Sequence, residues 1–372
     1  MIKILTVMTD ATLGGAGRVL LQTLRCLDRE RFEMVVAVPS GSVLAGLVEE
    51  LGYRVIQTEK GHDRSWEKGA VKEYKKIIRA ERPDIVHTHS SLAGKVAAWL
   101  CRVPVRIYTR HCVFEMPRRA TTFPGKQLSG LVNNTLSTAV VAVAHAAKEN
   151  LTDTGVDPKK ITVIINGVEP LEEHSLQQKQ EFRRSLGIGE EETVCLLSAR
   201  MEAYKGHSYL LETAALLKEE PIRFVLMGDG SCREELEQKA RSLGLDKVLF
   251  TGFVMDVVPY CNLCDINLNC SYGTEASSIA LAEGMSLGKP MVVTDFGGNP
   301  YMVTQGVNGI LVPQKDPAAM AEAILSLHRD RERYAALSQG ARKEYQKKFN
   351  ARAMTAQLEA LYEQQVNKGE KK

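Results

Sequence analysis

Short apolar runs rich in β-branched residues alternate with amphipathic stretches along most of the chain. In the helix expected at residues 14–27, for example, Val19, Leu20, Leu24 and Leu27 share one face. The first half is expected to hold strands at 1–8, 34–38, 55–57, 85–88, 105–109 and 139–144, and helices at 14–27, 42–51, 68–81, 91–100 and 145–154. Such alternation predicts a doubly wound parallel sheet.

The alternation stops at residues 163–167, gives way to a polar and acidic segment at 169–192, and then starts again. The second half is expected to hold strands at 193–198, 223–227, 248–250, 266–268, 291–293 and 310–312, and helices at 206–217, 232–243, 256–261, 278–286, 318–329, 330–349 and 351–366. We therefore expect an α/β protein with two Rossmann-like domains, 1–168 and 169–350, that face each other across a cleft. A C-terminal helix at 351–372 is expected to pack back on the first domain. Ligands of such sheets bind beyond the carboxyl ends of the strands, so the cleft is the expected site.

Composition is that of a globular protein: 44% of the 372 residues are hydrophobic and 25% are charged, which excludes a fibrous or largely disordered chain. No apolar run approaches the roughly 18–20 residues needed to cross a bilayer. The N-terminus lacks the pattern of a signal peptide, so we expect a cytoplasmic protein. The net charge of +3 divides into +8 for residues 1–168 and −5 for residues 169–372. The two halves are therefore expected to meet different partners.

The sequence offers little for a metal or a redox cofactor, and we expect neither. The chain contains no Asp-x-Asp, and the zinc-like spacing of Cys261 and Cys264 has no second pair. Gly15-x-Gly17 is followed by Leu20 instead of a third glycine, so it does not match a nicotinamide dinucleotide motif. A glycine turn that opens a helix still presents backbone N–H groups to an anion.

Four residues of the second half stand where a phosphorylated ligand would bind. Arg200 and Lys205 directly follow the strand at 193–198, and a guanidinium fork with an ammonium suits a diphosphate. Glu275 is expected in the loop before the helix at 278–286, and Glu283 inside that apolar helix, where a carboxylate needs a hydroxyl partner. The free N–H groups of residues 277–279 can receive a phosphate.

Histidines at the strand ends of the first half are the remaining candidates. We expect His87 and His89 to face opposite sides of their strand, which argues against joint metal binding. His87 is interpreted as a core residue, and both a structural and an acceptor-side role stay open for His89. His111 follows the strand at 105–109.

Taken together, the motifs resemble a known family, the retaining GT-B glycosyltransferases of family four, which include capsule and lipopolysaccharide enzymes. The resemblance rests on Gly14-Gly15, His87-Thr88-His89-Ser90, Asn166-Gly167-Val168, Arg200…Lys205-Gly206, Gly228-Asp229-Gly230, Gly252-Phe253-Val254, Glu275-x7-Glu283, Gly288-x-Pro290 and Gly297-Gly298, in family order. It implies the GT-B fold, with residues 1–168 on the acceptor side and residues 169–350 binding the donor.

The resemblance also implies a role for each motif residue. Arg200 and Lys205 would hold the donor diphosphate, Glu275 the hydroxyls of the transferred sugar, and Glu283 the ribose. The remaining donor-side contacts are implied for Gly14, Gly15, Gly228, Val254, Ser277, Ser278 and Ile279. His111 matches the histidine of the family that touches the sugar.

The sequence departs from the family pattern in two places. Ala276 stands where the family usually has glycine, and Ser277-Ser278 replaces its usual pair, which bears on sugar identity. Tyr301 stands where many members carry glutamate.

The expected activity is that of a metal-independent retaining hexosyltransferase. It would move a hexose or N-acetylhexosamine from a UDP- or GDP-type sugar to a glycan or lipid-linked acceptor in polysaccharide or lipopolysaccharide synthesis. If both glutamates bind hydroxyls, no nucleophile remains, so transfer on the front face of the sugar is expected. A GT-B-fold nucleotide-sugar epimerase and a non-catalytic nucleotide-sugar-binding protein are the alternatives.

A basic stretch of the first half suggests a membrane contact. Arg110, Arg118, Arg119 and Lys126 are interleaved with Phe114, Met116 and Phe123. Such a mixture can meet anionic headgroups at the inner face of the plasma membrane, and a solvated basic loop is the alternative. No recognition motif for nucleic acid accompanies it, and we expect no nucleic-acid partner.

Overall fold

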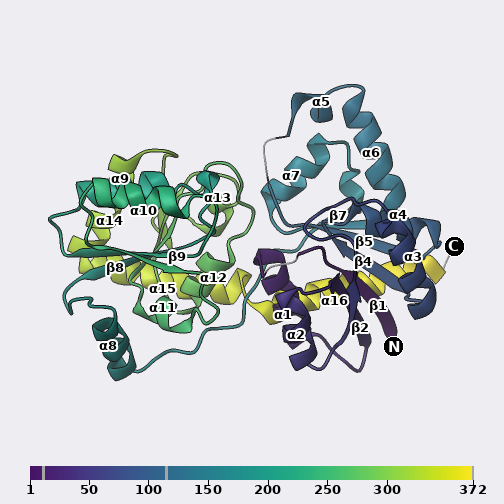
Figure 1. Ribbon diagram of the computed structural model, residues 1–372, viewed down its shortest axis with the longest axis horizontal. Helices are drawn as coiled ribbons and strands as arrows, with labels where there is room; N and C mark the ends of the chain where they lie inside the picture. The colour runs from purple at the N-terminus through teal and green to yellow at the C-terminus, as the bar shows by residue number, and fades with distance from the viewer. Residues whose placement is uncertain (11–12, 114–115, 371–372) are drawn as a thin grey trace. The chain divides into compact units, whose positions relative to one another are not determined.

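The computed structural model of the protein describes residues 1–10, 13–113 and 116–370 (Figure 1). The chain forms two compact units. The first unit contains Met1–Gly167 and Ala351–Lys372, and the second contains Val168–Asn350. Each unit is built on its own parallel sheet, so the predicted α/β fold is confirmed.

The first unit holds a seven-stranded sheet in the described residues, with the order β3-β2-β1-β4-β5-β6-β7 and every pairing parallel. Its strands are β1 (Ile2–Val7), β2 (Phe32–Pro39), β3 (Arg54–Thr58), β4 (Ile85–His89), β5 (Val105–Arg110), β6 (Ala139–Ala142) and β7 (Ile161–Val163). Its helices are α1 (Gly15–Cys26), α2 (Val43–Glu50), α3 (Ala70–Glu81), α4 (Leu92–Leu100), α5 (Arg118–Thr121), α6 (Gly125–Leu136), α7 (His145–Asp153) and α16 (Ala351–Glu370), with a 3-10 turn, η1, at Pro158–Lys160.

Helices α3, α4 and α6 form one layer of this unit, since α4 packs against both of the others. Right-handed crossovers that progress in one direction along a sheet place their helices on one face. Helix α1 turns back from β1 to β2, in the opposite direction, and it packs against α16 (Figure 1).

Helix α16 is last in sequence but belongs to the first unit. Glu359 accepts a hydrogen bond of 2.9 Å from the backbone N–H of Asp28. The Tyr362 hydroxyl lies 2.8 Å from Nδ1 of His87, and the Tyr362 ring packs against Phe32 at a centroid distance of 5.9 Å. Both Tyr362 and His87 are buried, so these contacts fix α16 to the sheet.

The second unit holds a six-stranded parallel sheet in the described residues, with the order β10-β9-β8-β11-β12-β13. Its strands are β8 (Thr193–Ser198), β9 (Ile222–Met227), β10 (Val248–Gly252), β11 (Ile266–Asn269), β12 (Met291–Thr294) and β13 (Gly309–Val312). Its helices are α8 (Leu176–Ser185), α9 (His207–Leu216), α10 (Arg233–Ser242), α11 (Val258–Leu263), α12 (Ile279–Ser286), α13 (Asn299–Met302), α14 (Pro317–Arg329) and α15 (Arg331–Lys348), with a 3-10 turn, η2, at Ala203–Lys205.

Five strands and helices lie outside the sequence expectation: β7, α5, α6, α8 and α13. Strand β7 is short and pairs with β6 at the sheet edge, and its run Ile161-Thr162-Val163 is apolar, so a strand could have been predicted there. Helix α8 buries none of its residues fully, and an apolar face was therefore not visible. A capping box between Ser175 and Gln178 starts it, and Phe182 packs edge-on against Tyr260 at 5.0 Å.

No helix among the described residues is long and apolar enough to cross a membrane.

Candidate functional site

In the second unit, the strand order changes direction between β8 and β11. These strands are hydrogen-bonded neighbours, and the chain leaves them toward opposite edges of the sheet. The space beyond the carboxyl ends at such a switch point is where doubly wound sheets bind ligands. Arg200 and Lys205 follow β8, and Glu275 follows β11. The sheet topology therefore brings three of the expected residues to one place.

The turn after β8 is held against the end of β11 by a glycine. Gly206 has φ +77°, and a Cβ there would lie 2.0 Å from the carbonyl oxygen of Cys270. Only glycine combines this left-handed backbone with so close an approach. The turn thereby places Lys205 beside the loop that carries Glu275.

Lys205 and Glu275 form an ion pair. Nζ of Lys205 lies 3.0 Å from Oε2 of Glu275 and donates to the carbonyl oxygen of Thr274 at 3.2 Å. The same Oε2 accepts hydrogen bonds from Nδ2 of Asn269 at 2.9 Å and from the hydroxyl of Ser271 at 3.2 Å. Glu275 is buried, and three donors fix this carboxylate oxygen in place.

Arg200 differs from Lys205 in being exposed. Its Nη2 donates to the hydroxyl of Tyr204 at 3.0 Å. In the part of the chain that the structure describes, no carboxylate forms an ion pair with it. Arg200 is therefore a cation oriented by a neutral partner, which leaves its charge for a ligand.

The loop before α12 is tightly packed. Gly298 donates its N–H to the carbonyl oxygen of Glu275 at 3.1 Å, and a Cβ at Gly298 would lie 1.5 Å from the carbonyl oxygen of Ala276. Ser278 caps α12, its hydroxyl accepting from the N–H of Leu281 at 3.3 Å. The N–H of Ser278 already donates to the sulfur of Met302 at 3.2 Å. The expectation that the N–H groups of Ser277, Ser278 and Ile279 are all free is therefore wrong for Ser278.

The other donor-side residues lie at the same edge of this sheet. Gly228 follows β9 and donates its N–H to the carbonyl oxygen of Gly252 at 2.9 Å, while Val254 follows β10. A Cβ at Gly228 would meet the carbonyl oxygen of Ala199 at 2.1 Å. Glu283 is buried within α12.

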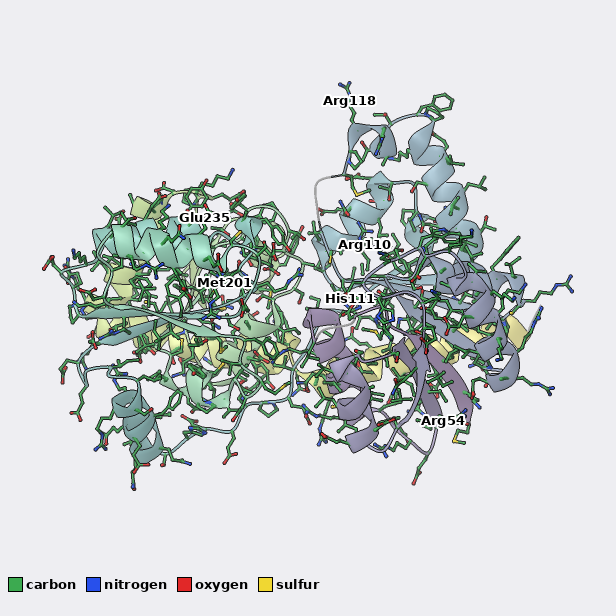
Figure 2. The ribbon with its side chains drawn as sticks, viewed as in Figure 1. Arg54, Arg110, His111, Arg118, Met201 and Glu235 are labelled. Atoms are coloured by element: carbon green, nitrogen blue, oxygen red, sulfur yellow. The ribbon has the colours of Figure 1, made fainter. Side chains whose placement is uncertain are left out.

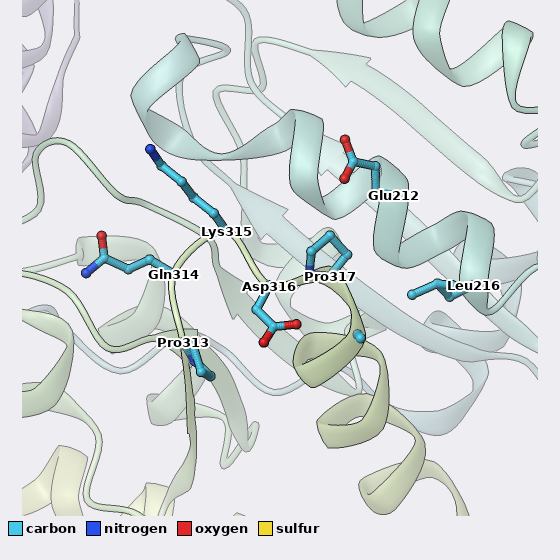
Figure 3. A pocket seen from close by; sticks show the side chains of 8 residues that line it. Glu212, Leu216, Pro313, Gln314, Lys315, Asp316 and Pro317 are labelled. Carbon is cyan, nitrogen blue, oxygen red and sulfur yellow. The ribbon is translucent and has the colours of Figure 1, made fainter.

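A hollow of about 500 Å³ lies beyond the end of β13, between α9 and the segment that leads into α14 (Figure 3). Glu212 and Asp316 line it together with Lys315, whose Nζ lies 4.5 Å from the ring centroid of Tyr272. None of the expected site residues lines this hollow.

In the sheet of the first unit, the strand order changes direction between β1 and β4. The glycine turn follows β1, and Gly15 begins α1. A Cβ added at Gly15 would have nothing within 4 Å, and one at Gly14 would be 3.8 Å from Oδ2 of Asp10. The packing of the described residues therefore does not require glycine at position 14 or at position 15.

The ends of β4 and β5 carry a cluster of three histidines. Nδ1 of His89 lies 2.7 Å from Nε2 of His111, and the two rings stack at 5.0 Å. The rings of His87 and His89 are 4.4 Å apart, and Nε2 of His87 lies 2.6 Å from the hydroxyl of Thr109. The expectation that His87 and His89 face opposite sides is wrong, because residues two apart on a strand share a face.

The cluster is uncharged at neutral pH. Burial lowers the pKa of His87 to about 3 and that of His111 to about 4, and burial with the neighbouring histidines lowers the pKa of His89 well below its usual value. Nε2 of His89 is buried and has no hydrogen-bond partner among the described residues. Neutral imidazoles suit hydroxyl groups better than phosphates.

A fourth buried histidine, His207, follows Gly206 directly. Neither of its ring nitrogens has a hydrogen-bond partner among the described residues, and burial, followed by the charge of Lys205, lowers its pKa to about 4.

Acid is expected to destabilise the protein through these histidines. Below pH 6.5, the ordinary pKa of histidine, these side chains bind protons in the unfolded chain, whereas in the folded protein they do so only near pH 4. The free energy of unfolding that they contribute at pH 7 is therefore lost as the pH falls from 6.5 toward 4. Between pH 7 and pH 5 the loss is up to about 2 kcal/mol for His207. Urea unfolding of wild type and His207→Leu at both pH values measures it, and an equal pH dependence in the two proteins would contradict it.

The basic residues of the first unit separate into two groups. Arg110 is half-buried and donates to Oδ1 of Asn150 at 2.9 Å and to the carbonyl oxygen of Cys112 at 3.0 Å. Arg118 and Arg119 are exposed on α5, and Lys126 lies on α6. Figure 2 shows Arg118 projecting from the α5 end while Arg110 lies closer to His111. Phe114, named with this group, falls outside the described residues.

Sequence reasoning missed the residues that hold Glu275. Asn269 donates to Glu275 and accepts at Oδ1 from the N–H of Ser271 at 3.0 Å. The available signal was Asn267 and Asn269 in a strand that is otherwise apolar, because a buried amide needs partners. For Tyr362 no sequence signal links it to His87.

Known proteins resemble both units. Residues 13–171 match the family described as Glycosyltransferase Family 4, and residues 178–344 match Glycosyl transferases group 1. An uncharacterized glycosyltransferase of Methanocaldococcus jannaschii, MJ1607, is 30% identical over 288 residues, which cover 72% of this chain and 73% of that protein. The UDP-Gal:alpha-D-GlcNAc-diphosphoundecaprenol alpha-1,3-galactosyltransferase of Escherichia coli is 28% identical over 351 residues, 89% of each chain.

The fold is also that of solved glycosyltransferases. The crystal structure of Anabaena Alr3699/HepE in complex with UDP and glucose superposes with a TM-score of 0.85 at 21% identity, covering 98% of this chain and 100% of that one. The predicted GT-B fold is thereby confirmed. With both units matched, the chain belongs to the group 1 glycosyltransferases of family 4.

Proposed function

We propose that this glycosyltransferase is a retaining hexosyltransferase. Its donor is a hexose or N-acetylhexosamine carried on a UDP- or GDP-type diphosphate, and its acceptor is a glycan or lipid-linked saccharide. One observation carries the proposal: the exposed guanidinium of Arg200, oriented by the Tyr204 hydroxyl, and the Lys205–Glu275 pair stand together at the switch point of the second sheet. Cations suit a diphosphate, and a fixed carboxylate suits sugar hydroxyls.

The similar proteins support this donor and acceptor chemistry. The name of the Escherichia coli relative specifies UDP-galactose as donor and a diphosphoundecaprenol-linked sugar as acceptor. The Anabaena structure contains UDP and glucose. Carrying both properties to this chain is part of the proposal.

The proposed mechanism is front-face transfer. The acceptor hydroxyl oxygen forms a bond to the anomeric carbon while the bond from that carbon to the diphosphate oxygen breaks. The hydroxyl proton moves to the departing phosphate oxygen, and both bonds lie on the same face of the sugar. Arg200 and Lys205 neutralise the charge that develops on the diphosphate, so no metal is required.

Glu275 serves as a binding group in this mechanism. Its Oε2 accepts from Lys205, Asn269 and Ser271, and a carboxylate engaged by three donors is a weak nucleophile. The proposal assigns the ribose hydroxyls to Glu283, the base to the backbone near Val254, and the phosphates to the turns at Gly228 and at Ser277–Ile279. In the first unit, the neutral His111 contacts sugar hydroxyls and His89 the acceptor.

Gly15→Ala tests whether the first glycine turn meets a ligand. Because the added methyl has open space around it and helix position N1 accepts alanine, we expect stability to rise by roughly 0.5–1 kcal/mol. A phosphate that contacts the backbone here would be displaced, so we expect an increase in the donor KM. Urea unfolding and initial rates measure the two effects. An unchanged KM would show that the glycine serves the turn alone.

A membrane contact through α5 and α6 is also proposed. Phe123 is 80% exposed, and Leu128 and Leu131 are 64% and 65% exposed, beside Arg118 and Arg119. Exposed apolar side chains among cations are typical of a surface that meets anionic lipid. The proposed location is the inner face of the plasma membrane, and flotation with anionic vesicles tests it.

The proposed reaction is tested by incubating the protein with UDP-, GDP- and ADP-sugars, with and without saccharide acceptors. Proton NMR of the product should show the anomeric configuration of the donor. An inverted product, or a trapped covalent glycosyl–enzyme intermediate, would contradict front-face transfer. A changed sugar still attached to its nucleotide would indicate an epimerase, and tight binding without turnover would indicate a binding protein.

A further inference from the structure

The two carboxylate oxygens of Glu275 have different surroundings. Oε2 accepts from Lys205, Asn269 and Ser271. Oε1 has no hydrogen-bond partner in the described part of the chain, and it is not among the enclosed polar atoms that lack one. Oε1 is therefore the oxygen that a ligand can reach, and Oε2 is the oxygen by which the protein holds the group.

The direction of the Asn269 amide is set by the groups on its other side. Its Oδ1 accepts from the backbone N–H of Ser271 at 3.0 Å and from Nδ2 of Asn299 at 3.4 Å. Asn269 is buried, and a flipped amide would turn its NH₂ group toward these two donors and its oxygen toward the Glu275 carboxylate. The amide therefore has one favourable orientation, in which Nδ2 donates to Oε2 of Glu275.

Asn299, the first residue of α13, completes this arrangement. Its Nδ2 also donates to the carbonyl oxygen of Thr294 at 3.0 Å and lies 3.3 Å from the Thr294 hydroxyl. Its own Oδ1 has no partner among the described residues, although the side chain is fully buried. A buried amide oxygen without a partner costs stability, so packing alone would favour an apolar side chain at this position. What the NH₂ group holds is a better explanation for this amide.

The segment around Asn299 also holds the backbone of the loop that carries Glu275. Thr294, the last residue of β12, donates its hydroxyl to the carbonyl oxygen of Ser271 at 2.6 Å. The N–H of Gly298 donates to the carbonyl oxygen of Glu275 at 3.1 Å. Residues 294–299 therefore bind both ends of the loop 271–275, and they reach its carboxylate through Asn269.

We propose that Asn269 and Asn299 are positioning residues for glycosyl transfer. They act through Glu275, holding its Oε2 so that Oε1 meets the sugar from one fixed direction. A carboxylate that turned about its last bond would present either oxygen, and a misplacement of about 1 Å in a binding group can cost about 100-fold in rate. The inference rests on the proposed function, which assigns the sugar hydroxyls to Glu275.

Asn269→Leu tests the inference, with Asn262→Leu as the matched control. Asn262 is buried too, and its amide also makes three hydrogen bonds, to the carbonyl oxygens of Glu172 and Val258 and from the N–H of His174. Both variants lose a buried amide, so similar falls in melting temperature are expected. Only Asn269→Leu should lower kcat/KM for the sugar donor, by about 100-fold, while the control stays within about threefold of wild type. Equal losses in both variants, or near wild-type transfer by Asn269→Leu, would overturn the proposal.

Binding of a nucleoside diphosphate alone separates positioning from collapse of the site. UDP, GDP and ADP lack the transferred sugar, so the affinity for whichever of them binds wild type should change less than about threefold in Asn269→Leu. Asn299→Leu should show the same division with a smaller loss of kcat/KM, about tenfold, because Asn269 keeps the Ser271 N–H. Parallel losses of diphosphate affinity and of transfer would show that the amides only support the fold, and would overturn the proposal.

Asn269→Asp gives a signature that a merely structural role would not produce. At high pH two carboxylates would face each other, beside the ammonium of Lys205, while His207, whose pKa is about 4, stays neutral. As the pH falls, the two carboxylates take up one proton, and the new carboxyl group donates to Oε2 in place of the amide. We expect kcat/KM relative to wild type to rise about tenfold between pH 8.5 and pH 5.5 in Asn269→Asp and to stay constant in Asn269→Leu. A ratio independent of pH in Asn269→Asp would overturn the proposal.

Unfolding in urea tests the contact without reference to activity. Asn269→Leu and Glu275→Gln, alone and combined, form a double-mutant cycle. Members of one hydrogen-bond network should shift the unfolding midpoint non-additively, and additive shifts would reject the network. If wild type binds no nucleoside diphosphate and transfers no sugar, the proposed function is rejected together with the role in transfer. The cycle then still decides whether Asn269 holds Glu275.

Discussion

Lys205→Met is expected to lower kcat for glycosyl transfer by about 1,000-fold, the usual effect of removing one fixed group that stabilises developing charge. Nζ of Lys205 lies 3.0 Å from Oε2 of Glu275. A water molecule that took its place would not hold a charge at this fixed position. Removing it also leaves Glu275 buried with only neutral donors, which costs on the order of 3 kcal/mol of stability. Release of nucleoside diphosphate and urea unfolding measure the two effects.

A double variant separates catalysis from the ion pair. Glu275→Gln removes the matching charge, so Lys205→Met with Glu275→Gln contains no unpaired buried charge. We expect the double variant to recover most of the lost stability, to within about 1 kcal/mol of wild type. Transfer should remain lost, because neither the cation nor the hydroxyl acceptor is restored. Recovery of transfer together with stability would show that the pair is structural only.

Arg200→Gln is expected to lower kcat/KM by about 100-fold, since it removes the guanidinium that we propose binds the donor diphosphate. Stability should change by less than about 0.5 kcal/mol, because the side chain is exposed and, among the described residues, bonds the Tyr204 hydroxyl alone. Arg200→Lys keeps the charge but not the fork, so partial recovery is expected.

The matched control for Arg200 is Arg331→Gln, which removes an exposed arginine at the start of α15. It should leave both kcat/KM and stability unchanged. Near wild-type transfer by Arg200→Gln, or an equal loss in the control, would contradict the assignment of Arg200 to the donor.

Apolar periodicity was enough to predict the two parallel sheets and the turns that carry Arg200, Lys205 and Glu275. Strand and helix periods differ, and each turn follows a buried strand, so local sequence fixes which residues reach the carboxyl edge. Helix α8 was missed for a physical reason, because it depends on a capping box and one aromatic contact, which produce no apolar pattern. Strand β7 was missed although Ile161 and Val163 gave an apolar signal.

Contacts between distant segments could not be predicted from local pattern. The Lys205–Glu275 pair joins residues 70 apart, and the contact of Tyr362 with His87 joins residues 275 apart. Both depend on the order of strands and on where α16 returns. The histidine cluster, in contrast, could have been predicted in part from the sequence. Residues two apart on a strand lie on the same face, so the spacing of His87 and His89 already indicated that their rings are neighbours.

The central claim is that the second unit holds the diphosphate of a sugar donor at the β8–β11 switch point. Calorimetric titration with UDP, GDP and ADP and their monophosphates, on wild type and on Arg200→Gln with Lys205→Met, tests it most directly. In wild type, at least one diphosphate should bind about 100-fold more tightly than its monophosphate, and the double variant should abolish that difference. Equal affinity for the two phosphate forms in wild type, or a preference that survives in the variant, would contradict the claim.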